Sequence, residues 1–402
     1  MAVRKGLRRM KRKVGISTVY TGFNYGSSLQ AYASKVYLSN MGYEAEVLSH
    51  KEGIVKGRDI RINKIAAMFL RTFWRPSLFK KTFLTYKNSL KKEIDIETKE
   101  AFLKFYDQKL KPSKYSWKEL KAYAKQKETL ACVCGSDQIW NATNVYIDPI
   151  FYLRFVPKHK RVAYAPSFGK NSVPEYNQKV ISKYISDIPY ISVREEQGTK
   201  IVKELINREV PSVVDPTLLL NKEEWASQIE NTITKPEKYI LVYFLDKPSE
   251  RALAYVKTLQ EQSKLPLVVI PYKYQEFGIF KNVEYKNAGP EQFLDLVRHA
   301  SFVCTDSFHG MIFSANFNTP FYIFQRDYGT ATDQSSRIVS ILNKLGLQDR
   351  FISQINQPKQ AELAEVNLMM DFTKANQLLE MERSKSKHYM KQAFDDIKKN
   401  EK

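Results

Sequence analysis

One histidine stands where acid–base chemistry is expected. His309 comes shortly after the apolar run Phe302–Thr305, which has the composition of a buried strand. Asp306 and Ser307 lie between them, and either would cap the helix predicted over Met311–Asn318. The free amides and the dipole of that helix form an anion site. An imidazole titrates near neutral pH, so His309 is suited to moving protons beside a bound anion.

Three arginines add positive charge near predicted strand ends. Arg194 ends a short apolar run, and a guanidinium in that place fits a bidentate contact to a carboxylate or phosphate. The alternative is that Arg194 pairs with its neighbours Glu195 and Glu196. Arg326 follows a later predicted strand and Arg337 opens the next helix. Both would contribute to the anion site of the histidine.

Two polar clusters follow strands in the first half of the chain. The first comes after the predicted strand Val14–Tyr20, and the second follows the apolar run Thr129–Cys134. Their candidate ligand-binding residues are Asn24, Tyr25, Gly26, Ser27 and Gln30 in the first cluster, and Asp137 and Gln138 in the second. Glycines and a helix N-terminus in the first favour an anion or a hydroxyl-rich ligand, although a tight strand-to-helix turn explains them as well. The first cluster is neither a dinucleotide loop nor an ATP loop.

Strands and helices alternate along most of the chain, which predicts parallel sheets with right-handed crossovers. A first series ends near Asp215-Pro216, where a hinge is expected, and a second series follows. The predicted fold is therefore α/β, with two domains joined by the hinge and a cleft between them. Ligands of such sheets bind at the carboxyl ends of the strands. We expect domains over 1–220 and 221–370, a helical insertion over about 51–127, and a helical tail over 371–402. Residues 212–214 are expected to form a strand at the end of the first series.

Charge is concentrated at the N-terminal end of the chain. The protein has 402 residues and a net charge of +21, of which residues 1–92 carry +16. Within this region Arg61–Lys92 holds no acidic residue and interleaves Phe69, Phe73 and Trp74 with lysine and arginine. Such a segment favours an anionic membrane surface, the alternative being an amphipathic helix packed on its own domain. Because the rest of the chain is nearly neutral, we do not expect a nucleic acid partner.

Composition places the chain among globular proteins of a reducing compartment. Hydrophobic residues make up 43%, and three cysteines are too few for a disulfide framework. No apolar run approaches the length of a membrane span, and the basic N-terminus lacks the apolar segment of a secretory signal. We therefore expect a cytoplasmic protein. The histidines and cysteines show no metal-ligand spacing, so no metal and no cofactor are expected.

Six stretches, taken in order, resemble the polysaccharide pyruvyl transferase family. They cover most of the chain, from about Val14 to Arg350. They are Asn24-Tyr25-Gly26 with Leu29-Gln30-Ala31-Tyr32, Gly135-Ser136-Asp137-Gln138-Ile139-Trp140-Asn141, Ala163-Tyr164-Ala165-Pro166-Ser167-Phe168-Gly169, Ser192-Val193-Arg194-Glu195-Glu196, Val214-Asp215-Pro216-Thr217-Leu218-Leu219 and Thr305-Asp306-Ser307-Phe308-His309-Gly310. Each stretch is short, and their order makes the resemblance specific.

The resemblance implies a glycosyltransferase-B-like architecture, with two Rossmann-like domains facing a cleft. It also implies transfer of the pyruvyl group of phosphoenolpyruvate to two sugar hydroxyls, as a ketal, in cell-surface polysaccharide biosynthesis. It implies His309 and Arg194 as catalytic residues. Donor-binding residues are then Ser307, Gly310, Arg326, Arg337 and Glu195. The residues named above in the two polar clusters would bind the acceptor, a lipid-linked or nucleotide-linked sugar. The enzyme would work at the inner face of the membrane.

This chain departs from the family at one position of the last motif. Characterised members carry an arginine two residues before the histidine, where this chain has Ser307. One donor contact is therefore missing or supplied elsewhere. Two other functions stay open: a glycosyltransferase of the same fold that uses a nucleotide-sugar donor, and a non-catalytic membrane-docking subunit of a polysaccharide assembly complex.

Overall fold

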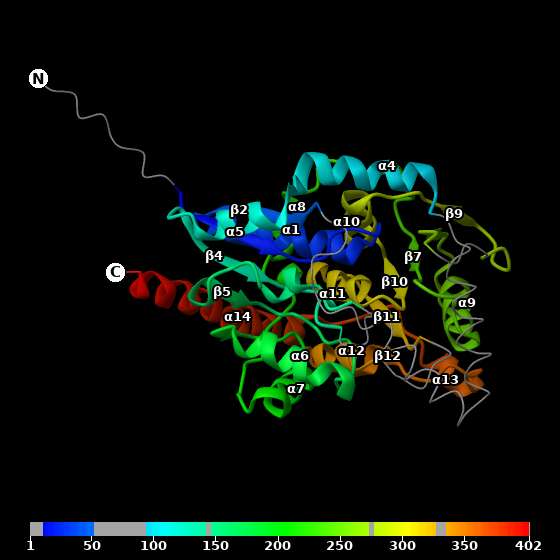
Figure 1. The fold of residues 1–402 in the computed structure, drawn as a ribbon. Coiled ribbons are helices and arrows are strands. Elements are labelled where there is room, and N and C mark those ends of the chain that lie inside the picture. The colour runs from blue at the N-terminus through cyan, green and yellow to red at the C-terminus, as the bar shows by residue number, and fades with distance from the viewer. Residues whose placement is uncertain (1–10, 52–93, 142–145, 273–276, 327–334, 402) are drawn as a thin grey trace, which may run out of the picture.

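The computed structural model describes residues 11–51, 94–141, 146–272, 277–326 and 335–401. Within these ranges the strands form two parallel sheets of six strands each (Figure 1). Each sheet with its helices forms one domain, in chain order, as the alternation of strands and helices predicts. The α/β class and the two Rossmann-like domains expected from the sequence are thus confirmed.

The first sheet has the order β3-β2-β1-β4-β5-β6. Its strands are β1 (Lys13–Ser17), β2 (Glu44–His50), β3 (Ser113–Tyr115), β4 (Thr129–Cys134), β5 (Arg161–Ala163) and β6 (Tyr190–Ile191). Its helices are α1 (Tyr25–Asn40), α4 (Ile96–Phe105), α5 (Trp117–Lys125), α6 (Glu175–Ser186) and α7 (Glu196–Ile206), with a π-helical turn, η1 (Tyr106–Leu110), after α4.

Strand β4 shows why a continuous apolar run predicts a strand covered on both faces. Ala131 and Val133 pack into the hydrophobic cluster that includes α1. Cys132 and Cys134 point the other way, into the cluster formed with α5, α6 and α7. Side chains alternate across a strand, so a strand buried on both faces is mostly apolar along its whole length. The cysteines lie in the sheet and are fully buried.

The second sheet has the order β12-β11-β10-β7-β8-β9. Its strands are β7 (Ile240–Tyr243), β8 (Leu267–Val269), β9 (Val283–Tyr285), β10 (Phe302–Thr305), β11 (Phe321–Phe324) and β12 (Phe351–Ile352). Its helices are α9 (Glu250–Ser263), α10 (Pro290–His299), α11 (Phe308–Phe317), α12 (Ser336–Leu345) and α13 (Gln360–Ala364). Between the sheets run a 3-10 turn, η4 (Pro216–Leu218), and the short helix α8 (Lys222–Ala226).

The two domains are packed tightly against each other. One hydrophobic cluster contains core residues of both sheets, from Val14 in β1 to Val303 in β10. At its centre Tyr25 of α1 stacks on Phe293 of α10, with ring centroids 4.6 Å apart, and its hydroxyl donates to the carbonyl of Ala288 at 2.6 Å. The cleft predicted between the domains is therefore confined to the strand ends, and a shared core lies beneath it.

The last helix, α14 (Thr373–Asn400), returns to the first domain. In Figure 1 it runs from the second domain along β5 to the end of the first domain that lies away from the second. Ser386 accepts a hydrogen bond from the amide of Val214 at 3.0 Å, and the hydroxyl of Tyr389 donates to the carbonyl of Ala163 at 3.3 Å. The region predicted as a helical tail is helical, and it is part of the first domain's packing.

Three local expectations differ from the structure. The region up to Lys127, expected to be helical, contains the strand β3, whose residues Ser-Lys-Tyr lack an apolar pattern. Strand β12 is two residues long and was not predicted. Residues 212–214, expected to form a strand, contribute only an isolated bridge between Val193 and Ser212.

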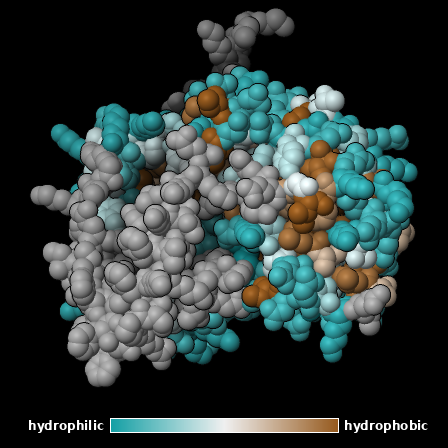
Figure 2. Space-filling model, turned by 90° about the vertical axis from the view of Figure 1, so that its right-hand side faces the viewer, coloured by the Kyte–Doolittle hydropathy of each residue, from teal (hydrophilic) through white to brown (hydrophobic). Residues whose placement is uncertain are grey.

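The described surface offers no membrane-spanning element. No helix in the described ranges combines the length and the apolar character needed to cross a bilayer. On the face drawn in Figure 2, hydrophilic side chains predominate and apolar ones gather in a patch toward its right-hand side. The basic segment Arg61–Lys92, predicted to contact a membrane, lies outside the described residues.

Candidate active site

The histidine singled out by the sequence lies in the first turn of α11, directly after β10. Ser307 is the N-cap of this helix, and its hydroxyl accepts a hydrogen bond from the amide of Gly310 at 3.3 Å. Thr305 in turn accepts from the amide of Ser307 at 3.0 Å. These two contacts fix the turn from strand to helix. They place His309 at the helix N-terminus with only 7% of its surface exposed.

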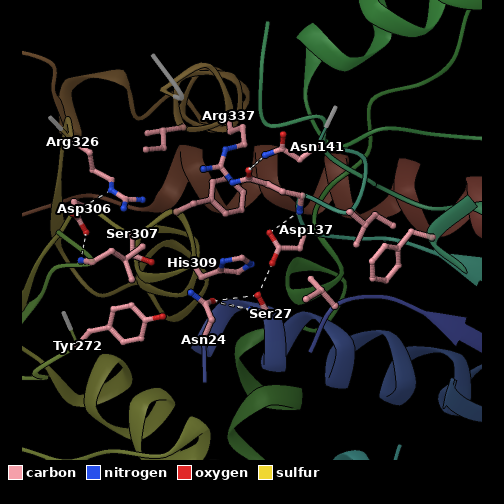
Figure 3. A pocket seen from close by; sticks show the side chains of 17 residues that line it. Asn24, Ser27, Asp137, Asn141, Tyr272, Asp306, Ser307, His309, Arg326 and Arg337 are labelled. Carbon is pink, nitrogen blue, oxygen red and sulfur yellow. Dashed lines mark hydrogen bonds and ion pairs between the residues drawn. The ribbon is translucent and has the colours of Figure 1, made fainter. Parts of the chain in front are cut away.

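The N-terminus of α1 meets that of α11 from the other domain. Asn24 caps α1 by accepting a hydrogen bond from the amide of Ser27 at 3.1 Å. Gly26 follows, and it faces His309 so closely that a Cβ atom there would lie 1.9 Å from Nδ1 of the ring. Figure 3 shows the imidazole next to Asn24 and Ser27. Two helix N-termini, one from each domain, therefore converge on His309.

A cavity of about 410 Å³ opens at this junction, within the size range of small-molecule sites. Polar side chains from both domains line it together with a smaller apolar set (Figure 3). The polar lining comprises Asn24, Ser27, Asp137, Gln138, Asn141, Tyr272, Asp306, Ser307, His309, Arg326 and Arg337. Val19, Ile139, Phe151, Leu245, Phe308 and Ile338 complete the wall.

Asp137 is the acidic group that the first domain adds to this wall. Its Oδ2 accepts a hydrogen bond from the hydroxyl of Ser27 at 2.6 Å, which joins the end of β4 to α1. Burial alone would raise the pKa of Asp137, but the neighbouring Arg194 and His309 outweigh burial and lower it below its ordinary value. Asp137 is therefore an ionised hydrogen-bond acceptor at neutral pH. With its amide oxygen toward the second domain, Gln138 accepts from Arg337 Nη1 at 2.9 Å.

Behind the cavity lies a buried ionic cluster of Arg194, Asp215 and His309. Arg194 Nη1 donates to Asp215 Oδ2 at 2.7 Å, and His309 Nε2 lies 3.8 Å from the same oxygen. Burial opposes ionisation of Asp215, yet His309 and Arg194 hold the pKa of that carboxyl well below its ordinary value. The cluster therefore joins the first domain to the catalytic histidine candidate through one carboxylate.

Arg326 brings a guanidinium to the opposite side of the cavity. Its Nε donates to Asp246 at 2.9 Å and lies 3.5 Å from Asp306. The carboxylate of Asp306 also accepts hydrogen bonds from the backbone amides of Leu245 and Asp246, at 2.6 and 3.1 Å. Burial raises the pKa of Asp306 to about 6, with Arg326 acting in the opposite direction. The cation of Arg326 is thus shared between two carboxylates.

The sequence profile described as polysaccharide pyruvyl transferase matches residues 24–328 of this chain. That span runs from the cap of α1 to just past Arg326 and so includes most of the cavity wall. The chain belongs to the polysaccharide pyruvyl transferase family. No curated protein sequence matches it.

Several solved structures have a fold similar to that of this pyruvyl transferase family member. UDP-N-acetylglucosamine 2-epimerase from Rickettsia bellii is similar with a TM-score of 0.50 and 9% identity, over 96% of this chain and 98% of that one. MurG from Acinetobacter baumannii has a TM-score of 0.43 and 12% identity, over 97% and 100%. Two parallel-sheet domains in a glycosyltransferase-B-like arrangement are thus the architecture of this family member.

Most of the predicted site residues of this family member come together at the cavity. They line it from both domains, as the strand-end argument requires. From the second domain these are His309, Ser307, Arg326 and Arg337, and from the first Asn24, Ser27, Asp137 and Gln138. Arg194, predicted as catalytic, lies outside the wall. Its guanidinium carbon sits 4.5 Å from the ring centroid of Phe308, which does line the cavity.

The other predicted binding residues have local contacts outside the wall. Glu195 accepts hydrogen bonds from Ser167 and the amide of Phe168, and it lies 3.8 Å from Arg194, as one alternative anticipated. The side-chain amide of Gln30 donates a hydrogen bond to the hydroxyl of Thr18 at 2.9 Å. Tyr25 packs in the domain interface. Gly26 and Gly310 make room, for His309 and for Thr305, respectively.

Sequence reasoning missed four polar residues of the candidate site, one of which, Asp306, was considered only as a helix cap. Tyr272 and Asn141 line the cavity, and Asp215 holds the ionic cluster behind it. Asp215-Pro216-Thr217 was noted as a hinge and as a family motif. The signal for its role was an aspartate directly after a predicted strand, like Asp137, although the structure forms only an isolated bridge there. In the described part of the chain, no three histidine, cysteine or acidic side chains are grouped to hold a metal ion.

Proposed function

We propose that this protein transfers the pyruvyl group of phosphoenolpyruvate to two hydroxyls of a sugar, forming a ketal, in polysaccharide biosynthesis. The observation that carries the proposal is the position of His309. It lies at the junction of two helix N-termini, in one cavity wall with Arg326 and Arg337. Membership of the pyruvyl transferase family supports the reaction class.

The reaction needs two proton transfers and a leaving phosphate. The methylene carbon of phosphoenolpyruvate gains a proton, and the oxygen of the first sugar hydroxyl bonds to the neighbouring carbon. The carbon–oxygen bond to phosphate then breaks, and the second hydroxyl takes its place. One hydroxyl proton ends on the new methyl group and the other on phosphate, so the atoms balance without an oxidant or reductant. A group that gives and takes protons near neutral pH serves both transfers, and we assign this role to His309.

The remaining polar groups divide between donor and acceptor. In the proposal, Arg326 and Arg337 bind the anionic donor on the second-domain side, with Ser307 and the amides of α11 beside them. Arg194 adds positive charge from behind Phe308. Side chains of the first domain bind the acceptor hydroxyls: Asn24, Ser27, Asp137 and Gln138. No metal is required if the arginines stabilise the departing phosphate, so we expect activity to survive a chelator.

The test is phosphate release from phosphoenolpyruvate in the presence of sugar acceptors. We expect His309→Ala to lower turnover by roughly 10²–10⁴-fold, with a smaller change in donor affinity. His388→Ala is the matched control, because His388 is exposed on α14, away from the cavity wall. Near-normal turnover of His309→Ala would remove the mechanism. Release of a nucleotide from a nucleotide sugar, with no release from phosphoenolpyruvate, would instead identify a glycosyltransferase.

We also propose that the enzyme works at the cytoplasmic membrane surface, where a lipid-linked acceptor would be held. The basic segment Arg61–Lys92 carries this proposal, since each lysine or arginine near an anionic surface contributes on the order of 1 kcal/mol. Sedimentation with anionic vesicles should be strong at low salt and weak at high salt. Equal binding to neutral and anionic vesicles, or binding to neither, would contradict it.

A further inference from the structure

Asp215 presents its two carboxylate oxygens to different neighbours. Oδ1 accepts hydrogen bonds from the amide and the hydroxyl of Thr217, at 3.0 and 2.9 Å, and so caps η4. Oδ2 accepts from the hydroxyl of Ser136 at 2.9 Å and from Arg194 at 2.7 Å, and it lies 3.8 Å from Nε2 of His309. Capping the turn needs only Oδ1. The second oxygen therefore serves the buried ionic cluster.

Arg194 and His309 each have side-chain nitrogen atoms without a hydrogen-bond partner among the described residues. These atoms are Nε2 of His309 and both Nε and Nη2 of Arg194. His309 is 7% exposed and Arg194 6% exposed, so water does not readily replace the missing partners. A buried polar atom without a partner costs about 1–3 kcal/mol. Packing would not favour such an arrangement by itself, whereas a reaction that needs these groups would retain it.

The charged groups around His309 come from four elements. Asp215 precedes η4, Asp137 follows β4, Arg194 follows β6 and Arg337 belongs to α12. Of these, Asp215 makes the ion-pair contact with the ring, at 3.8 Å. On the other face Gly26 of α1 leaves no room for a side chain next to Nδ1. The ring is thus held between a carboxylate at Nε2 and a backbone at Nδ1.

We propose that Asp215 is a positioning residue of the active site, which orients His309 with Nε2 toward its carboxylate and stabilises the protonated ring. The inference rests on the proposed function, since only a histidine that moves protons during catalysis needs such control. A buried carboxylate beside a catalytic imidazole fixes which nitrogen carries the proton and favours the imidazolium. Asp215 would do both across the domain boundary.

The test that needs no substrate is NMR of the whole protein labelled with ¹⁵N-histidine, with the His309 signals assigned from the His309→Asn variant. We expect the neutral ring to carry its proton on Nε2. In Asp215→Asn the pH midpoint of the His309 signals should fall by about one unit or more, because a charge less than 4 Å away is lost. The other four histidines should not move.

Asp295→Asn is the matched control. Asp295 is equally buried and pairs with Nδ1 of His299 at 3.0 Å, on α10. This variant should move the His299 signals and leave those of His309 in place. An unchanged His309 midpoint in Asp215→Asn would overturn the proposal. If that variant does not fold, the wild type decides, since a proton on Nδ1 of the neutral ring would overturn it as well.

An activity measurement tests the positioning role of Asp215 separately from the proposed function. If the wild type releases phosphate from phosphoenolpyruvate, Asp215→Asn should lower kcat by at least 10-fold with little change in KM, and its pH profile should move to lower pH with the NMR midpoint. Unchanged kcat would contradict the positioning role. If the wild type releases no phosphate, the proposed function fails, while the NMR result still judges the contact between Asp215 and His309.

Discussion

His309 lies at the domain junction because the residue that faces it has no side chain. Gly26 belongs to α1 of the first domain, and its Cα approaches the imidazole more closely than any other residue type would allow. Glycine lowers the stability of a helix by about 1 kcal/mol relative to alanine, so its presence in the first turn of α1 has a local cost. The close approach of the ring explains why that cost is accepted.

We expect Gly26→Ala to lower activity by at least 10-fold and to lower Tm, although alanine favours the helix. The added Cβ would lie 1.9 Å from Nδ1, so the ring or α1 must move. Thermal unfolding and the phosphate-release assay measure the two effects. Gly278→Ala is the matched control, because a Cβ there would have no heavy atom within 4 Å. A Tm for Gly26→Ala equal to that of the control would show that the contact is not tight.

Side chains that follow a strand directly were predictable, and those that act through another residue were not. Ser307 and Asp137 were found because the carboxyl ends of parallel strands meet at one edge. Asp215 follows residues 212–214, which form only an isolated bridge, and its role depends on contacts to Arg194, 21 positions earlier, and to His309 in the other domain. No spacing in the sequence encodes a contact of that range.

The helix α14 connects the two domains through one buried arginine. Arg383 donates from Nε to the carbonyl of Leu218 in η4 at 2.7 Å, and from Nη2 to Asn316 of α11 at 3.1 Å. Only 5% of its surface is exposed. The helix that carries His309 is thus held at its far end by a residue of the last helix. The polar composition of α14 predicted a helix, but it did not predict that Arg383 would contact both η4 and α11.

Arg383→Met should lower the free energy of unfolding by about 2–3 kcal/mol, because two buried acceptors lose their donors while the alkyl part of the side chain is kept. Lys385→Met, two positions along the same helix, is the control. Lys385 is largely exposed and forms a surface ion pair with Glu382, so its loss should change stability by less than about 0.5 kcal/mol. Urea unfolding measures both. Equal effects of the two substitutions would contradict the role of Arg383.

The short strands mark the limit of pattern reasoning for secondary structure. β4 and β10 were predicted because every position in them is buried and all but one threonine in each are apolar. β3 lies at one edge of its sheet with partly exposed residues, and β12 contributes two residues to an edge. Edge strands are selected by the neighbour with which they pair, and this neighbour lies outside any local window.

The ionised aspartates in and behind the cavity wall make the stability of the whole protein depend on pH. Asp137 and Asp215 have folded-state pKa values below the ordinary 3.8 of the unfolded chain. Below about pH 4 the unfolded chain therefore binds more protons than the folded one. The stabilisation is complete above that pH and is lost as the pH falls toward the folded values.

Asp215→Asn should accordingly be less stable than the wild type by about 3–5 kcal/mol at pH 7, since it leaves Arg194 buried without its main partner. The difference in the free energy of unfolding between the variant and the wild type should become smaller as the pH falls below 4. Urea unfolding between pH 3 and pH 7 checks this, with Asp349→Asn as the control, because Asp349 is exposed and should change stability little at any pH. A difference that stays constant over this range would argue against an ionised Asp215.

Alkylation of the buried cysteines can measure how often each sheet opens. Cys132 and Cys134 lie in β4 and Cys304 in β10, so each sheet holds thiols that an alkylating reagent reaches only when that sheet opens. Burial also raises the pKa of Cys132 to about 12, which keeps it unreactive while folded. Because one hydrophobic cluster joins both domains, we expect the peptides from the two sheets to be labelled at the same rate. Two different rates would reveal a domain that opens while the other stays closed.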